Sequence, residues 1–245
     1  MPIPASPSTL RIALVVALGS VLSAAATPET LAACSVTGGV SVPTVVELYT
    51  SEGCSSCPPA DRWLAGLKDR PGIVRLAFHV DYWDRLGWKD RFADPAYTVR
   101  QQAISQRGGS RFVYTPQVLV DGADWRGWPA LPPSTPHPAP VQVTLVEDDA
   151  GYLARVVRGP AAPVRLAGFW VVTEDGLESK VGAGENAGAT LRHDAVVREF
   201  VELPSLGDMP LRFSPRTAAG SGARRQVRFV ITDPTNGRPL QAASC

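Results

Sequence analysis

The sequence lacks several patterns that would assign a function at once. Its 24 lysine and arginine residues nearly balance its 23 aspartate and glutamate residues, and there is no run of like charges. This balance leaves no electrostatic footprint for nucleic acid or an anionic membrane surface. The glycine-rich segment 182–188 lacks the spacing and the lysine of a phosphate-binding loop. We therefore predict that nucleic acid is not a partner.

Metal ligands are also scarce. The chain has three histidines, which are scattered at positions 79, 137 and 193, and one C-x-x-C motif. Zinc prefers four nitrogen or sulfur ligands, so we predict no metal site and no cofactor. Copper could use two thiolates together with His79, the only histidine in the same half as the motif. Copper handling is therefore kept as an alternative.

The N-terminus has no apolar run long enough for a permanent membrane anchor. Arg11 precedes an apolar run over 12–22, and small residues follow it, so residues 1–26 predict a signal peptide. We expect a periplasmic or secreted protein without a transmembrane anchor, whose N-terminal segment 27–42 precedes the fold. Residues 31–34 also have the residue types of a lipoprotein site that would lipidate Cys34, but residues 27–30 separate this site from the apolar run.

Four cysteines in an exported chain permit three pairings. If the C-x-x-C motif is a redox site, Cys54 pairs with Cys57, and Cys34 and Cys245 are left. Domain termini are often close together, so we predict a structural disulfide between Cys34 and Cys245. The alternative is that both are free or lipidated, and an even count in an oxidising compartment argues against it.

The C-x-x-C motif lies where a buried strand turns into a helix. Residues 45–50 are an apolar, β-branched strand, and Pro58 begins a predicted helix over 58–68. Cys54 is thereby placed over the helix N-terminus, where free N–H groups favour a thiolate. This arrangement is typical of redox chemistry.

Further along, the sequence predicts a strand over 73–80 and a helix over 97–107. Pro116 then opens an apolar run that ends in Asp-Gly, which predicts an X-Pro bond followed by a strand and a hairpin. The segments 48–61, 80–84 and 114–117 together resemble the DUF1223 family of secreted thioredoxin-like proteins, a domain of unknown function. The resemblance implies a thioredoxin-like fold, in which a cis-proline preceded by Thr or Val packs against the C-x-x-C motif.

The second half of the chain looks different. Six of the twelve residues in 129–140 are proline, which indicates a semi-rigid linker. Beyond it, strands are predicted at 141–146, 152–157, 164–172, 195–202 and 226–232. We therefore predict an α/β thioredoxin-like domain over 43–128, followed by a small antiparallel, sandwich-like β domain over 141–245. The loop 182–188 could pack on the first domain and replace its missing closing helix.

The predicted chemistry is thiol–disulfide exchange. Cys54 is the candidate nucleophile and Cys57 resolves the mixed disulfide. Glu47, a carboxylate in an apolar strand, is the candidate base, although a solvent-facing glutamate is equally consistent with the sequence. Thr115 and Pro116 would hold an extended substrate backbone.

A loop rich in aromatic residues follows the second strand, at the strand ends where ligands bind in open α/β sheets. It supplies the candidate substrate-binding residues Asp81, Trp83, Asp84 and Trp88. The alternative is that these tryptophans are core and the aspartates are caps.

The sequence thus predicts an exported thiol–disulfide oxidoreductase. It would act on a protein or small thiol or disulfide substrate, with a redox partner protein as a further candidate. Besides copper handling, a binding module whose C-x-x-C motif is a structural disulfide is the alternative.

Overall fold

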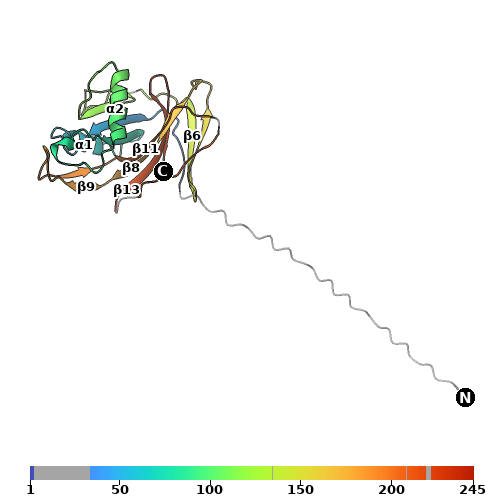
Figure 1. The fold of residues 1–245 in the computed structure, drawn as a ribbon. Coiled ribbons are helices and arrows are strands. Elements are labelled where there is room, and N and C mark those ends of the chain that lie inside the picture. The colour runs from blue at the N-terminus through green and yellow to red at the C-terminus, as the bar shows by residue number, and fades with distance from the viewer. Residues whose placement is uncertain (3–33, 134, 208, 219–221) are drawn as a thin grey trace. The chain divides into compact units, whose positions relative to one another are not determined.

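The computed structural model describes residues 1–2, 34–133, 135–207, 209–218 and 222–245. Residues 3–33, which cover all but the first two residues of the predicted signal peptide and the first part of the predicted N-terminal segment, therefore lie outside the described residues, and Figure 1 draws them in grey. Among the described helices, none combines the length and apolar character that crossing a membrane requires.

An eight-stranded mixed sheet dominates the fold (Figure 1). The pairs β2–β3 and β3–β11 are parallel, and the other neighbours are antiparallel. In spatial order its strands are β14 (Pro239–Ser244), β13 (Arg224–Thr232), β8 (Ala167–Asp175), β11 (Val196–Leu203), β3 (Ile73–His79), β2 (Thr44–Thr50), β4 (Gln117–Val120) and β5 (Ala123–Asp124).

Two smaller sheets and three short helices complete the described chain. The four-stranded sheet contains, in order, β1 (Ser35–Thr37), β6 (Val141–Asp148), β7 (Gly151–Arg158) and β12 (Leu211–Phe213). The two-stranded sheet pairs β10 (Thr190–His193) with β9 (Leu177–Lys180). The helices are α1 (Pro58–Ala65), the 3₁₀ helix η1 (Asp84–Leu86) and α2 (Pro95–Arg107).

The predicted fold class is wrong. The structure is mostly β-sheet, and β11, from the predicted β domain, lies beside β3 from the predicted α/β domain in one sheet. Both α-helices and the strands β2, β3, β4, β6, β7, β8, β11 and β13 were recognised from local pattern, with shifts of a few residues at their ends, whereas β1, β9, β10, β12, β14 and η1 were not predicted. Which strands pair depends on the edges and faces that become buried together, often between segments far apart in the sequence. The local sequence pattern therefore does not predict the strand partners.

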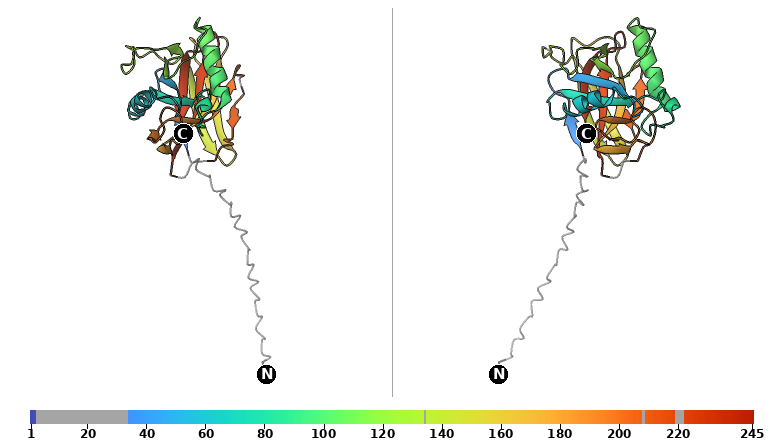
Figure 2. Two further views of the ribbon diagram at one scale, coloured as in Figure 1. Left: turned by 60° about the vertical axis from the view of Figure 1, so that its left-hand side comes forward. Right: turned by 90° about the vertical axis from the view of Figure 1, so that its left-hand side faces the viewer.

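Side-chain alternation gives the large sheet two apolar faces. Val45, Tyr49 and Val171 belong to a core cluster that also includes Tyr97 of α2. On the opposite face there are two separate core clusters. In one, Val46 and Leu48 pack with α1. In the other, Trp170 and Val172 of β8 pack against the four-stranded sheet. The left view of Figure 2 shows α1 and α2 on opposite sides of the strands.

Local chemistry explains why the elements near the C-x-x-C motif begin and end where they do. Pro58 occupies the first turn of α1, where its missing N–H costs nothing. The β4–β5 hairpin turns at Asp121 and Gly122, whose positive φ angles of 52° and 80° suit a two-residue turn. The side chain of Asp121 also accepts a hydrogen bond from Val45 N at 2.8 Å, which ties this turn to β2.

The two ends of the described fold are joined, as predicted. Cys34 and Cys245 form a disulfide with a Cα–Cα distance of 5.8 Å. Backbone hydrogen bonds hold each cysteine in place, from Glu147 N to Cys34 O and between Cys245 and Val227 in both directions. A sulfur in a disulfide has no bond left for a thioether lipid, so this pairing and lipidation of Cys34 are mutually exclusive.

Candidate redox site

The C-x-x-C motif lies between β2 and α1, as the strand–loop–helix pattern predicted. Cys54 and Cys57 form a disulfide, and no cysteine in the chain is free. Two turns shape the loop, because Cys54 N donates to Ser51 O and Cys57 N donates to Cys54 O, both at 3.2 Å. Cys57 is the N-cap residue of α1, and the hydroxyl of Ser56 lies 3.4 Å from Cys54 Sγ. A Cys54 thiolate would therefore have a hydroxyl donor beside it.

Both cysteines are completely buried, with 0% exposure. A segment far away in the sequence, residues 182–188, contacts their loop, and we call it the strap. Asn186 Nδ2 donates to the carbonyls of Glu52 and Cys54, each at 2.9 Å. Glu185 Oε2 accepts from Ser55 N at 2.9 Å and from Ser55 Oγ at 2.8 Å. The glycine-rich loop thus packs on the C-x-x-C element, as the sequence analysis suggested.

Thr115 and Pro116 lie beside the same loop. The peptide bond between them is cis. Tyr49 of β2 is paired with Gln117 of β4, and continuing this antiparallel register by one residue brings Pro116 opposite Thr50, just before the C-x-x-C loop. The structure therefore brings the predicted proline to the strand end that carries the cysteines.

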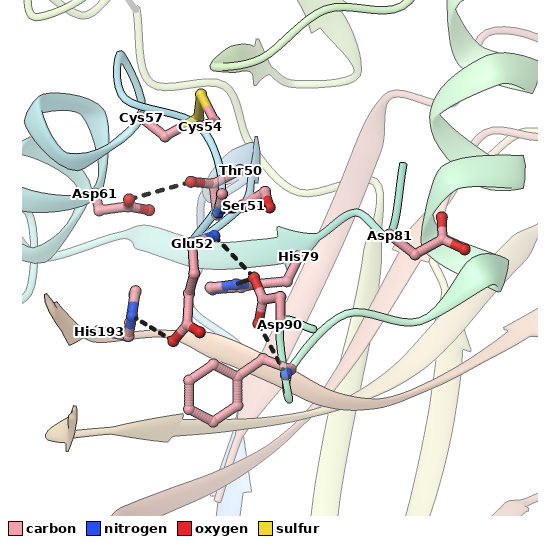
Figure 3. Close-up of polar contacts among 12 residues, drawn as sticks. Thr50, Ser51, Glu52, Cys54, Cys57, Asp61, His79, Asp81, Asp90 and His193 are labelled. Carbon is pink, nitrogen blue, oxygen red and sulfur yellow. Dashed lines mark hydrogen bonds and ion pairs between the residues drawn. A yellow bond between two sulfur atoms is a disulfide. The ribbon is translucent and has the colours of Figure 1, made fainter. Parts of the chain in front are cut away.

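Asp61 is a site residue that the sequence analysis missed. Its backbone N–H donates to Cys57 O at 3.1 Å, which places it one helical turn after Cys57. Its carboxylate accepts a hydrogen bond from Thr50 Oγ1 at 3.1 Å, and Figure 3 shows both side chains together with the disulfide. Burial raises the pKa of Asp61. The spacing of four residues from Cys57 was the signal that would have identified it.

Glu47 is not brought to the cysteines. It lies on the face of β2 that carries Tyr49, whereas α1 packs on the other face. Arg100 Nη2 of α2 donates to Glu47 Oε1 at 3.1 Å, and Arg100 Nη1 contacts both Glu47 Oε2 and the Tyr49 hydroxyl. The structure gives Glu47 an ion pair beneath α2, away from the disulfide. A one-residue shift in a strand reverses the face, and this decides against Glu47.

The two tryptophans of the aromatic loop reach the C-x-x-C element. Trp83 Nε1 donates to Thr115 Oγ1 at 2.8 Å, and a Cβ added to Gly53 would lie 3.1 Å from the Cβ of Trp83. Trp88 Nε1 donates to Glu52 Oε2 at 2.7 Å. Both tryptophans therefore form part of the wall around the disulfide loop.

The two aspartates of the same loop have local roles. Asp81 accepts from Thr98 Oγ1 of α2 at 2.5 Å, and Figure 3 shows it directed toward that helix. Asp84 Oδ1 accepts from Asp90 N at 3.2 Å within the loop. The structure thus places Asp81 and Asp84 as loop and helix contacts, which was the alternative interpretation.

Two buried acid–histidine pairs lie on the α1 side of the sheet, and the sequence analysis named their histidines but not their acidic partners. His79 Nδ1 lies 2.7 Å from Asp90 Oδ2, and His193 Nε2 lies 3.1 Å from Glu52 Oε1 (Figure 3). The partners come from segments too far apart in the sequence for a motif to reveal them. Within the part of the chain that the structure describes, no three His, Cys, Asp or Glu residues are arranged to hold a metal ion.

Comparison with known proteins places the chain in a family. The profile described as "Protein of unknown function (DUF1223)" matches residues 45–232. The chain belongs to the DUF1223 family. No curated protein matches the sequence. The DUF1223 match contains the C-x-x-C loop, the cis-proline and the strap, so it covers the whole candidate site.

Two solved structures are similar to this DUF1223 protein. A structural-genomics crystal structure of an Agrobacterium tumefaciens protein aligns with a TM-score of 0.58 at 21% identity, covering 83% of this chain and 94% of that one. HBP35 of Porphyromonas gingivalis aligns with a TM-score of 0.51 at 15% identity, covering 85% of this chain and 76% of that one. At these identities the likeness concerns the fold alone.

Proposed function

We propose that this DUF1223 protein is a thiol–disulfide oxidoreductase that uses Cys54 and Cys57. The observation that carries the proposal is the combination of a C-x-x-C disulfide at a helix N-terminus with the half-buried carboxyl of Asp61 one helical turn later. The helix N-terminus favours the thiolate of the first cysteine, and the carboxyl can exchange a proton with the second. The substrate class is a protein or small molecule that carries a thiol pair or a disulfide.

The reaction is reversible and needs no other reactant. In the oxidising direction, a substrate thiolate attacks Cys54 Sγ, the Cys54–Cys57 bond breaks, and Cys57 leaves as a thiolate that takes a proton from Asp61. A second substrate thiolate then attacks the substrate sulfur of the mixed disulfide and releases the Cys54 thiolate. The substrate loses two electrons and the protein gains them. In the reducing direction the same steps run backwards, and Asp61 accepts the proton of Cys57.

Exchange requires access to a buried disulfide. Because Cys54 has 0% exposure, an attacking sulfur must first displace the strap or the neighbouring Trp83. The strap contacts are hydrogen bonds, of which those to Ser55 are exposed. Bonds of this kind contribute only about 0.5–1.5 kcal/mol each, so displacing the strap costs little free energy.

The same burial favours a second candidate function. A fully covered disulfide is also what a structural cross-link would look like, and the protein would then be a non-catalytic binding module. The two functions differ in reduction potential. Structural disulfides lie below about −300 mV, whereas exchange catalysts lie between about −270 and −120 mV.

A glutathione titration of the full chain separates these functions. After equilibration and acid quenching, free thiols are alkylated. Mass spectrometry of the peptide that carries Cys54 and Cys57 then gives the fraction in which the pair is reduced. A reversible transition between about −270 and −120 mV supports the oxidoreductase. A pair that stays oxidised below about −300 mV overturns it and supports the structural cross-link.

Substrate trapping is the complementary experiment. Cys57→Ser removes the resolving thiol, so mixed disulfides with Cys54 should accumulate and appear on non-reducing gels. Cys54→Ser is the matched control and should trap little, because its remaining thiol is the resolving one. Equal trapping by both variants would contradict the assigned roles.

We also propose that the protein is exported, because the N-terminal pattern and the two disulfides both suit an oxidising compartment. Cell fractionation with a C-terminal tag tests this directly. Recovery of the tagged protein in the cytoplasm with reduced cysteines would contradict export.

A further inference from the structure

The buried histidine His79 lies close to the proposed proton acceptor. In the parallel β2–β3 ladder, His79 is paired with Thr50, the residue that donates a hydrogen bond to Asp61. Neighbouring residues of paired strands point to the same face of a sheet, so His79 and Thr50 both face α1. His79 has 0% exposure, and Figure 3 draws it together with Asp61 and Asp90.

The surroundings of His79 favour the charged form of its imidazole. Burial opposes protonation, but the charge and hydrogen bond of Asp90, together with the charges of Asp61 and Glu52, outweigh it and raise the pKa of His79. The pKa of Asp90 is lowered to about 2, because the charge and hydrogen bond of His79 outweigh its burial. The remaining ring nitrogen, His79 Nε2, is buried and has no hydrogen-bond partner among the described residues. Asp90 therefore satisfies only one of the two ring nitrogens of His79.

Four other titratable groups face His79, from two elements and two loop segments. Glu52 comes from the C-x-x-C loop, Asp61 from α1, Asp90 from the segment after η1 and His193 from β10. The His79 and His193 rings lie 5.0 Å apart between centroids, and His193 is itself held by Glu52. The carboxylate of Glu52 is hydrogen-bonded to His193 and Trp88, whereas the charge of His79 lowers the pKa of Asp61.

We propose that His79, held by Asp90, is a positioning residue for the Cys54–Cys57 reaction, whose charge controls proton exchange between Asp61 and Cys57. This inference rests on the proposed function. When Cys57 leaves as a thiolate and takes a proton from Asp61, a carboxylate is created in a half-buried position. The His79 charge stabilises that carboxylate, so the proton transfer becomes easier. No electrons pass through His79, since they move only between sulfurs.

A buried ion pair is a poor means of stabilising a fold, because apolar residues of similar volume usually give equal or greater stability. The position of His79 beside Thr50, its unpartnered nitrogen and its electrostatic effect on Asp61 together give the pair a task that apolar residues cannot perform.

The first test removes the pair. His79→Gln/Asp90→Asn replaces both members by uncharged side chains that can still hydrogen-bond, and His137→Gln, at an exposed histidine, is the matched control. His79 lowers the pKa of Asp61 more than Asp90 raises it, so without the pair reduced Cys57 and Asp61 ionise less easily and the disulfide is favoured. We expect the double variant to stay oxidised at a glutathione ratio roughly tenfold more reducing than wild type requires. The control should change by less than twofold.

The second test uses the wild-type protein and does not depend on the folding of a variant. Coupling between two sites is reciprocal, so if His79 acts on the dithiol, reduction must change the titration of His79. Long-range ¹H–¹⁵N spectra of the three histidines, recorded against pH, should show a higher titration midpoint for His79 in the reduced than in the oxidised protein. His137 should have the same midpoint in both.

The outcomes are distinguishable. If the wild-type pair shows no reversible glutathione transition, the proposed function and this inference both fail. If the wild type titrates but the His79 midpoint is unchanged by reduction, only the inference fails. A folded double variant that titrates like His137→Gln also overturns the inference alone.

Discussion

Asp61 is a carboxyl placed one helical turn after Cys57, and burial makes it a better proton acceptor than a surface aspartate. Its amide counterpart has nearly the same shape and can still accept the hydrogen bond of Thr50. The residue therefore offers a clean test of proton transfer that separates chemistry from packing.

We predict that Asp61→Asn slows resolution of the mixed disulfide by about 10²-fold, since general acid–base catalysis contributes about 10²–10⁴-fold. Rapid-quench kinetics with a small disulfide substrate measures the rate against pH. The slowing should diminish at high pH, where Cys57 ionises without help. Asp69→Asn, an exposed aspartate just beyond α1, is the control and should leave the rate unchanged. A pH profile identical to wild type would contradict the role of Asp61.

The His79–Asp90 pair should make stability depend on pH. The pKa of Asp90 is lowered to about 2 from an ordinary 3.8, so its contribution is present above about pH 4 and is lost as the pH falls through 2. The pKa of His79 is raised from an ordinary 6.5, so its contribution is complete below pH 6.5 and is lost as the pH rises through the raised value. The pair therefore stabilises the fold most between about pH 4 and 6.5.

We expect Asp90→Asn to lower the free energy of unfolding by about 3–5 kcal/mol in that window, because it leaves a buried charge unpaired. The difference should shrink at higher pH, where His79 loses its proton. Urea unfolding followed by tryptophan fluorescence measures both effects, with Asp69→Asn as the surface control. A loss of stability that is the same at all pH values would contradict the ion pair.

At the scale of elements, the strap is the feature that most affects access. Asn186 makes two of its hydrogen bonds, to the carbonyls of Glu52 and Cys54. The strap turns sharply at Gly184, which has a φ of +76° and whose added Cβ would lie 3.7 Å from Gly53 Cα. Glycine suits this turn because of the positive φ, whereas a Cβ would meet Gly53 only at an ordinary contact distance.

We predict that Asn186→Ala accelerates reduction of the Cys54–Cys57 disulfide roughly 5- to 100-fold, because two hydrogen bonds worth about 0.5–1.5 kcal/mol each are lost. The rate is followed as the appearance of thiols after addition of dithiothreitol. Asn236→Ala, in an exposed turn, is the matched control and should react like wild type. An unchanged rate in Asn186→Ala would show that the strap does not limit access.

The same scale shows how far the site could be predicted. The strand, loop and helix around Cys54, and the proline strand at Pro116, follow from patterns spanning a few residues and were found. The strap contacts were anticipated only as a packing role for a glycine-rich loop. Asn186 and His193 could not be assigned, because each meets its partner across more than 130 residues of sequence.

At the scale of the whole molecule, Cys34 and Cys245 close almost the entire described chain, with a sequence separation of 211. Cys245 is tied to β13 of the large sheet, and Cys34 to β6 of the four-stranded sheet. The disulfide therefore joins the two sheets in addition to joining the ends.

We predict that Cys34→Ser/Cys245→Ser lowers the free energy of unfolding by about 5 kcal/mol in the chain-entropy treatment, or somewhat less if the unfolded chain retains structure. Cys54→Ser/Cys57→Ser is the comparison, and it should cost only about 2 kcal/mol, because its loop is so short. Thermal unfolding of both double variants measures the difference. A larger loss from the Cys54/Cys57 variant would reverse the assigned structural role.

The sequence by itself determined the local features of this protein. It specified the C-x-x-C junction and eight of the fourteen described strands, because hydrophobic period and turn residues act over short distances. The Cys34–Cys245 pair followed from the cysteine count instead. Only the tertiary structure decided that β11 joins β3, that Glu47 lies under α2, and that Asp61 and His79 lie on the α1 face. Those outcomes depend on which edges and faces are buried together, and that balance is settled by the whole chain at once.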